Sequence, residues 1–246
     1  MSIDGKMITK AQVKHIRSLE NKKMRLTHNE FVVEGDKMVT ELLAQNYGLS
    51  RLFATEKWLV KNEKYRDQAI IIEDFELSKI SFLQTPNEVL AIANLPRTET
   101  YEIKNLAIAL DNLQDPGNVG SIIRIADWYG IDVVFLSNNC ADAFNPKTVQ
   151  STMGSIFRVK IVVCDLLNVL KENPSIPSYA AILKGENVNE ISRIDKGIIL
   201  IGNESRGISD EIIEATKYKV TIPKLGHAES LNAAVACGII CSRLLS

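Results

Sequence analysis

The chain has 246 residues, with 29 basic and 30 acidic side chains, and 46% of its residues are hydrophobic. This composition is typical of globular proteins and excludes disordered and collagen-like chains. At roughly 100 to 200 residues per domain, the length indicates one large domain or two modest ones. No stretch reaches the ~18 to 20 apolar residues that a membrane span needs, and the first residues lack the apolar region of a signal peptide. We therefore expect a cytoplasmic protein with no membrane partner.

The four cysteines are too few and too irregularly spaced for a disulfide framework, so we expect reduced thiols. Cys237 and Cys241 are four residues apart, which places them on one face of a helix. No cysteine or histidine with the spacing of a zinc site accompanies them. The pattern predicts two buried thiols and no metal site.

The basic residues are concentrated near the N-terminus. Residues 1–25 contain seven lysines and arginines but only two acidic residues. Such a run can be the solvated face of a helix, or it can be a surface that attracts phosphate groups. The charge pattern alone favours the solvated helix face.

The first part of the chain predicts a small α/β domain. Apolar residues at helical spacing predict helices over Asp36–Gln45 and Glu76–Phe82. Short apolar runs predict strands at Phe31–Val33, Arg51–Ala54, Ala69–Ile72 and Val89–Ala93. The polar residues 96–104, which include Pro96, read as a linker between domains of residues 1–95 and 105–246.

From residue 105 onward, apolar runs alternate regularly with segments that have helical periodicity. This alternation is typical of an α/β domain with a parallel sheet. The predicted strands are Leu106–Leu110, Val133–Leu136, Ile161–Val163, Ala180–Leu183 and Ile198–Ile201. The last segment, Ser230–Leu245, is apolar nearly all round and rich in small residues, so we expect it to be buried within the domain or against a second subunit.

Three segments of this second domain carry candidate chemistry, and the first is QDPGNVGSIIRIAD. A strand here runs into a turn and then into a helix that carries Arg124. The segment lacks the glycine patterns GxGxxG and GxxxxGK[ST], which disfavours a dinucleotide-dependent oxidoreductase and a P-loop enzyme. Taken by itself, Arg124 is better interpreted as an arginine on the helix surface.

The second segment, IGNESRGIS, follows a buried strand. Ligands of open α/β sheets bind at the carboxyl ends of strands, where this loop is expected. Gly202 would leave room for a ligand to approach the backbone, and Glu204 could accept hydrogen bonds from that ligand or order the loop. A tight turn explains the same residues without a ligand.

The third segment, IPKLGHAESLN, joins a strand end to the C-terminal helix through a glycine-containing loop. Ser230 suits the N-cap position of that helix. Asn232 lies further into an apolar helix, where a polar side chain needs a hydrogen-bonding role of its own.

In this order, the three segments closely resemble the SpoU/TrmH group of the SPOUT superfamily, which are RNA ribose 2′-O-methyltransferases that use S-adenosylmethionine. The resemblance also includes NPKTVQSTMGSIFRV and the extension of the third segment to IPKLGHAESLNAAVACGI. KKMRLTHNEFVVEGDKMV resembles the small ribosomal-protein-like substrate-binding domain of many such enzymes. The resemblance implies a C-terminal domain with a trefoil knot, and a homodimer in which each active site draws on both chains.

The resemblance also implies roles for individual residues. It assigns Arg124 to activation of the ribose hydroxyl, and it gives further catalytic positions to Asn118, Glu204, Ser230 and Asn232. It places cofactor contacts on the main chain around Gly202, Ile222 and Leu231, with Leu200 and Ile201 leading into the first of these.

Free arginine stays protonated far above neutral pH, so we expect Arg124 to position a phosphate and stabilise a developing alkoxide. It could act as a base only if its pKa were strongly depressed. The sulfonium of the cofactor supplies the electrophile, so the reaction needs no metal. Within the basic N-terminal run, we expect Lys22, Lys23 and Arg25 to contact RNA phosphates.

The sequence departs from the family pattern at two places. Gln150-Ser151-Thr152 stands where relatives often have Arg-Ala-Ser, and Ala233-Ala234 replaces a common Val-Ser. These changes affect substrate detail and leave the expected catalytic residues intact. We expect a structured RNA, ribosomal rather than transfer RNA, and no DNA. The alternatives are a tRNA 2′-O-methyltransferase and a non-catalytic RNA-binding protein that kept the fold.

Overall fold

The structure, a computed structural model, describes residues 7–97 and 101–245. The chain divides into two compact units. The first unit comprises Met1–Arg97 and Phe144–Phe157, and the second comprises Thr98–Ala143 and Arg158–Ser246. Phe144–Phe157 thus fall outside the second unit, although the predicted second domain spans residues 105–246. Within the described ranges, no helix is both long and apolar enough to cross a membrane.

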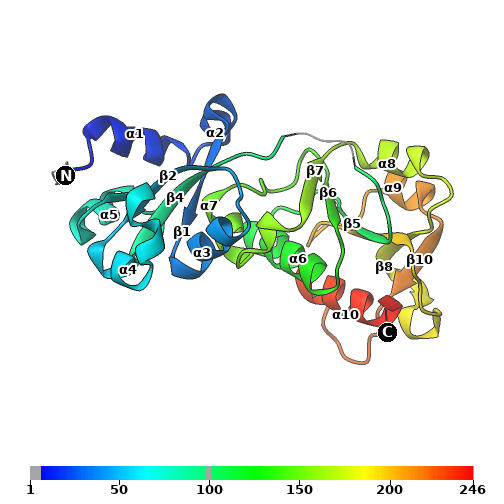
Figure 1. The fold of residues 1–246 in the computed structure, drawn as a ribbon. Helices are drawn as coiled ribbons and strands as arrows, with labels where there is room; N and C mark the ends of the chain where they lie inside the picture. The colour runs from blue at the N-terminus through cyan, green and yellow to red at the C-terminus, as the bar shows by residue number, and fades with distance from the viewer. Residues whose placement is uncertain (1–6, 98–100, 246) are drawn as a thin grey trace. The chain divides into compact units, whose positions relative to one another are not determined.

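The first unit is built on a four-stranded sheet in the order β1-β4-β2-β3 (Figure 1). Its strands are β1 (Glu30–Glu34), β2 (Leu49–Ala54), β3 (Ala69–Ile71) and β4 (Val89–Asn94). β4 runs antiparallel to β1 and β2, whereas β2 and β3 are parallel. All four predicted strands are confirmed. They read as continuous apolar runs because side chains alternate between two buried faces of the sheet.

Helices cover both faces of this sheet. On one face, α1 (Lys10–Ser18) and α5 (Asp74–Ile80) bury Ile16 and Leu77 against the strands. On the other face, α3 (Asp36–Ala44) and α4 (Glu56–Lys61) bury Leu42 and Trp58. The predicted helices are confirmed as α3 and, beginning two residues earlier, α5. The remaining helical segments of residues 7–97 are α2 (Lys22–His28) and η1 (Glu63–Gln68).

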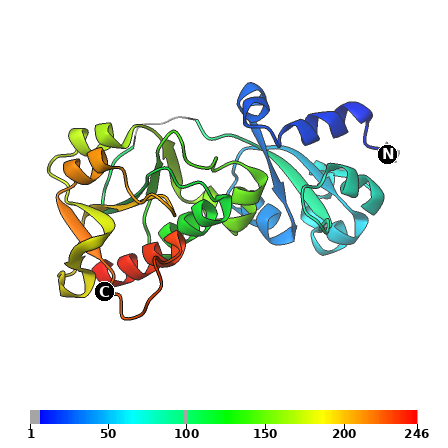
Figure 2. The same cartoon turned by 180° about the vertical axis from the view of Figure 1, so that it is seen from behind.

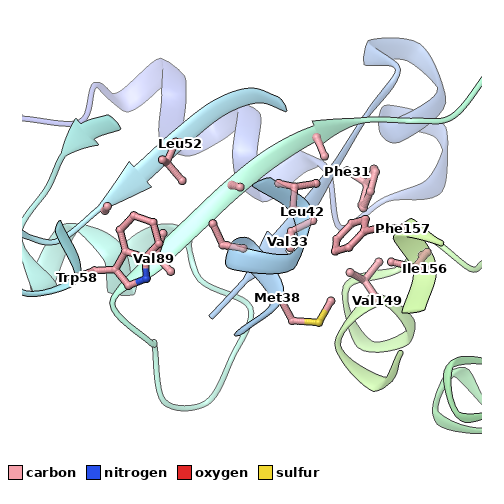
Figure 3. Packing of buried hydrophobic residues seen from close by; sticks show 14 of the residues in the cluster. Phe31, Val33, Met38, Leu42, Leu52, Trp58, Val89, Val149, Ile156 and Phe157 are labelled. Atoms are coloured by element: carbon pink, nitrogen blue, oxygen red, sulfur yellow. The ribbon is translucent and has the colours of Figure 1, made fainter. Parts of the chain in front are cut away.

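Residues from the middle of the chain complete the core of the first unit. The helices α7 (Pro146–Ser151) and η2 (Ser155–Phe157) contribute Val149, Ile156 and Phe157 to the cluster that contains Phe31 and Leu42 (Figure 3). The segment NPKTVQSTMGSIF, which lies between two strands of the second unit, therefore folds as part of the first.

The second unit contains a six-stranded sheet in the order β10-β8-β9-β5-β6-β7, and every neighbouring pair is parallel. The predicted parallel α/β sheet is confirmed. Its strands are β5 (Leu106–Leu110), β6 (Val133–Leu136), β7 (Lys160–Val163), β8 (Ser178–Asn187), β9 (Gly197–Ile201) and β10 (Tyr218–Thr221). Because β5 and β9 are adjacent and parallel, the loops that follow them leave the sheet at the same edge.

Two pairs of helices enclose this sheet. α8 (Leu166–Glu172) and α9 (Asp210–Ala215) pack into one hydrophobic cluster with the strands, and η3 (Val188–Glu190) follows β8. α6 (Pro116–Trp128) and α10 (Ala233–Leu245) lie side by side, as Figures 1 and 2 both show. In α10, the thiols of Cys237 and Cys241 are buried with their sulfur atoms 4.0 Å apart, as predicted. The hydrogen bond between the two thiols, together with burial, raises the pKa of Cys237.

Candidate active site

Hydrogen bonds join the first two sequence motifs at the ends of β5 and β9. The Asp111 amide donates to the carbonyl of Ile201 over 2.8 Å. The buried Asp111 carboxylate in turn accepts from the amide of Ser209 at 2.8 Å. The side-chain amide of Asn203 donates to the Asn112 carbonyl, also at 2.8 Å. The two loops are therefore fixed to each other by backbone and side-chain contacts.

The loop after β9 closes on itself. The amide and carbonyl of Asn203 pair with those of Gly207 at 2.9 and 3.0 Å. A Cβ atom on Gly202 would lie 2.2 Å from the Gly207 carbonyl carbon and 2.3 Å from the Ile208 nitrogen. The explanation that Gly202 leaves room for a ligand is therefore wrong. The chain's own backbone fills that space, so the turn requires a glycine there.

One asparagine connects all three motifs. Asp115 caps the start of α6 by accepting from the amide of Asn118 at 2.8 Å. The side-chain nitrogen of Asn118 donates to Glu204 Oε1 at 2.9 Å, and its side-chain oxygen accepts from Asn232 Nδ2 at 2.8 Å. Asn118 thus meets two residues that follow it by more than 80 positions, at a point that we call the Asn118 junction (Asn118, Glu204 and Asn232).

Asn232 has a second role at the start of α10. Its side-chain oxygen accepts from the amides of Ala234 and Val235 at 3.0 and 3.2 Å. Asn232, and not Ser230, therefore caps the C-terminal helix, which corrects the expectation for Ser230. The helix begins two residues later than that expectation required, and Ser230 lies exposed in the preceding loop.

Arg124 projects from the outer side of α6. The face of α6 toward the sheet carries buried residues such as Val119, Ile123 and Ala126, and Arg124 lies away from that face and is exposed. It follows Asn118 by six residues, about 9 Å along the helix axis. An exposed guanidinium at this distance from the Asn118 junction is accessible to a large anionic ligand.

Comparison with known proteins identifies the chain. Residues 105–242 match the family model described as SpoU rRNA Methylase family, and residues 10–91 match the MRM3-like substrate binding domain. The chain belongs to the SpoU rRNA methylase family. This confirms the resemblance stated from the three motifs, and the N-terminal match confirms a substrate-binding domain of that family type.

Relatives of this SpoU methylase align along most of its length. The Bacillus subtilis (strain 168) protein named 23S rRNA (guanosine(2553)-2′-O)-methyltransferase RlmP is 30% identical over 243 residues, which is 93% of this chain and 94% of the relative. A solved structure from Porphyromonas gingivalis, assigned to the TrmH family, has a TM-score of 0.87 at 35% identity and covers 98% of this chain and 99% of its own. An AdoMet-bound rRNA methyltransferase from Sinorhizobium meliloti has a TM-score of 0.86 at 28% identity, with 97% of both chains covered.

The structure places the remaining predicted residues of this SpoU methylase in different surroundings. Leu200 and Ile201 are buried in β9, so their side chains serve the core of the sheet. Ile222 is half-buried and precedes a loop whose side chains are exposed from residue 223 to residue 232, and Leu231, within this loop, is 49% exposed. Only the second pair has side chains that a ligand can contact.

The three basic residues predicted to contact RNA also differ in their exposure to solvent. Lys22 and Lys23 are exposed on α2, where they line a groove with Leu26 and Thr27. Arg25 is only 2% exposed, and its Nη1 donates to the carbonyls of Leu19 and Glu20, each at 2.7 Å. The prediction that Arg25 contacts phosphate is therefore wrong, because its guanidinium holds the turn between α1 and α2.

Sequence reasoning missed two residues that organise the site. Asp111 is a buried carboxylate that ties the first motif to the second, and Asn203 orders the loop by accepting from the amides of Ser205 and Arg206. A signal for both was present. Each follows directly, or after one glycine, the last residue of a buried strand, where aspartate and asparagine commonly hydrogen-bond turn amides.

The Asn118 junction gives a directional test by exchange of donor and acceptor. We expect Asn118→Asp to reduce the methylation rate, because the new carboxylate cannot donate to Glu204 and repels it. Adding Glu204→Gln should restore much of the rate, because the new amide can donate to the new carboxylate. Rates of methyl transfer and thermal melting of both single variants and the double variant provide the measurement. If the double variant is no better than Asn118→Asp, the hydrogen bond between these residues does not support activity.

Proposed function

We propose that this protein transfers a methyl group from S-adenosylmethionine to a ribose 2′-hydroxyl of ribosomal RNA. The observation that carries the proposal is the Asn118 junction, which brings the three methylase motifs together beside the helix that carries Arg124. The relatives support the substrate and the cofactor. The Bacillus subtilis relative is named for 2′-O-methylation of a 23S rRNA guanosine, and the Sinorhizobium meliloti structure is named as AdoMet-bound.

The residues around the Asn118 junction fit S-adenosylmethionine. Small-molecule sites are mostly apolar, with a few well-placed polar groups. Leu231 and the fully exposed Leu225 offer apolar surface in the loop that leads to Asn232. We assign the adenosine and methionine contacts to the main chain around Ile222 and Leu231, next to the closed loop that begins at Gly202.

When bound, the cofactor supplies a methyl group on a positively charged sulfur, which reacts with an oxygen nucleophile without a metal. The protein's contribution is to position that oxygen and to favour loss of its proton. We assign Arg124 to this task because its planar guanidinium can bind a neighbouring phosphate with two hydrogen bonds and stabilise negative charge on the oxygen. Glu204 and Asn232 hold the two loops in place through Asn118.

The reaction itself provides the test of this function. Purified protein should transfer labelled methyl groups from S-adenosylmethionine to ribosomal RNA from cells that lack it, and the 2′-O-methyl site should be absent from those cells. Methylation of transfer RNA alone would favour the tRNA alternative. Failure to bind S-adenosylmethionine in calorimetry would favour a non-catalytic RNA-binding protein. The bacterial relatives support the cytoplasmic location that we propose.

We propose that the first unit binds RNA through Lys22 and Lys23. Each phosphate contact contributes roughly 0.7 to the slope of log affinity against log salt for single-stranded RNA, so replacing both lysines with glutamine should flatten the slope by about 1.4. RNA affinity should fall across sequences, because phosphate contacts do not read bases. Filter binding to ribosomal RNA at several salt concentrations measures both quantities.

A matched control removes two charges elsewhere in the same unit. Lys64 and Lys79 belong to η1 and α5, and their ammonium groups lie over the rings of Tyr65 and Phe75. Replacing this pair with glutamine should leave the salt slope at the parent value. Equal slopes for both double variants would mean that α2 is only a solvated helix face.

We also propose a homodimer formed through α6 and α10. These helices border an open groove of about 900 Å³ whose lining includes Ile125, Val235, Gly238 and Ile239, and Val235 is 51% exposed. Apolar surface of this kind is typical of subunit contacts. Sedimentation should give twice the mass of one chain, and Val235→Asp should give a monomer. We retain the trefoil knot as part of this proposal, supported by family membership.

A further inference from the structure

We propose that Trp128 is a stacking platform for a base of the RNA that lies next to the methylated nucleotide. This inference rests on the proposed function, because it takes Arg124 as the residue that contacts the target ribose and its phosphate. It adds a recognition site for a nucleobase to a surface otherwise assigned only to phosphate and ribose.

Trp128 is the most exposed aromatic residue among the large hydrophobic side chains of the described chain. It is 84% exposed at the last position of α6. Tryptophan is usually highly buried, and a large indole in water costs free energy that burial would recover. The other tryptophan, Trp58, is fully buried in the first unit. An indole that is exposed in the free protein is suited to reversible binding of an apolar partner.

The position of Trp128 on α6 places it beside Arg124. The two residues are four positions apart, so they lie one above the other on the same helix face, with Cβ atoms about 6 Å apart. Both are exposed and both lie opposite the buried face of α6. A strand of RNA that presents a phosphate to the guanidinium therefore has a neighbouring base within reach of the indole.

The charge around Trp128 favours an anionic chain. The adjacent Asp127 carboxylate would repel phosphate, but it is paired with Arg158 through Nη2 at 2.7 Å and Nε at 3.0 Å. Because Arg158 neutralises this carboxylate, the positive charge of Arg124 is not opposed on this side of the helix. A base that approaches the indole therefore meets no unpaired carboxylate at Asp127, the residue that precedes Trp128.

The surface that we assign to the homodimer contact does not include Trp128. Within the described part of the chain, the groove between α6 and α10 is lined by Asn118, Ser121 and Ile125 from α6. Trp128 is not among the residues that line the groove, but it follows Ser121 by seven positions and Ile125 by three, so it continues the same side of α6. Sedimentation of Trp128→Ala therefore distinguishes a base platform from a dimer contact.

Stacking on aromatic side chains is the usual way in which proteins hold unpaired RNA bases. It is tolerant of sequence, because every base has a π face, and it adds about 5-fold to 150-fold in affinity per base. The occupant we infer is therefore a single unpaired base, held by its face with no reading of its edge.

Tryptophan fluorescence tests the stacking directly. Because Trp58 is buried, a uridine 12-mer at low salt should quench the emission of Trp128, whereas heparin, an anionic chain without bases, should not. Trp128→Phe supplies the control in which only the buried tryptophan remains, and its emission should not respond. Equal quenching by heparin and RNA, or no quenching by RNA, would overturn the proposal.

Binding measurements on variants separate stacking from other roles. Trp128→Ala should weaken binding of the 12-mer about 5-fold to 150-fold, Trp128→Phe should weaken it less, and S-adenosylmethionine affinity should be unchanged in both. If Trp128→Ala keeps parent RNA affinity, or converts a dimer to a monomer in sedimentation, the residue does not serve as a base platform.

Arg124→Ala distinguishes failure of this inference from failure of the proposed function. In that variant, methylation should be lost. RNA should still quench the emission of Trp128, at RNA concentrations raised to offset the lower affinity that loss of the Arg124 charge causes. Retained methylation in Arg124→Ala would contradict the proposed function and leave the fluorescence result to decide the role of Trp128.

Discussion

Replacing Arg124 with alanine should reduce methyl transfer by at least about 100-fold to 1000-fold, the usual loss when one group that stabilises transition-state charge is removed. S-adenosylmethionine affinity should stay near the parent value. The reason is positional, because Arg124 is exposed on the outer face of α6, about two turns from the Asn118 junction. Single-turnover methylation of ribosomal RNA, together with calorimetry for the cofactor, measures the two effects separately.

Two variants serve as controls for Arg124→Ala. Arg124→Lys keeps the charge but loses the planar fork, so it should recover only part of the rate. Arg193→Ala removes an exposed arginine of the second unit, whose Nε lies 3.9 Å from Oδ1 of Asp195. This variant should leave the rate unchanged. Full turnover by Arg124→Ala would refute the role proposed for this residue.

Gly202→Val should abolish measurable binding of S-adenosylmethionine and lower the melting temperature. Even the Cβ of alanine would lie 2.2 Å from the backbone of Gly207, and backbone cannot move aside as a flexible side chain can. The closed loop from Asn203 to Gly207 must therefore open, which breaks its paired hydrogen bonds and displaces Glu204 from Asn118. Gly202→Ala should already weaken cofactor binding at least about tenfold, equivalent to about 1.4 kcal/mol.

The matched control for Gly202 is another glycine in the same unit. Gly130 follows α6 with a φ of +66°, and a Cβ there would meet nothing within 4 Å. Gly130→Ala should cost about 1 kcal/mol of stability through backbone strain and leave cofactor affinity unchanged. If Gly202→Ala binds the cofactor as well as Gly130→Ala does, the closed loop is not part of the cofactor site.

Much of the fold could be predicted from the sequence because its signals are local. Strands such as β5 and β6 are short apolar runs bounded by polar residues, and their ends agree with the prediction. The position of the second motif at the carboxyl end of a strand also followed from local signals. The third motif follows β10, which β8 separates from β9, so its contact with Asn118 could not be predicted in this way.

The roles of several residues could not be predicted, because they depend on partners distant in space or on exact helix ends. Arg25 belongs to a basic run, yet its burial depends on how α1 turns into α2. Residue 202 must be glycine because the backbone of Gly207, five residues later, occupies the space that a Cβ atom would need. Ser230 and Asn232 are both good capping residues, and only the observed start of α10 decides between them.

The contribution of α7 and η2 to the first unit has a consequence for synthesis of the chain. Domains generally fold in order as they leave the ribosome, at about 5 to 20 residues per second. Here Val149, Ile156 and Phe157 complete a core that otherwise ends at residue 97. The first unit must therefore wait for about 60 further residues, or about 3 to 12 s, with an apolar face uncovered. Its final folding is thus coupled to synthesis of the methylase sheet, because the first unit is not completed before β5 and β6, two of the six strands of that sheet, have been made.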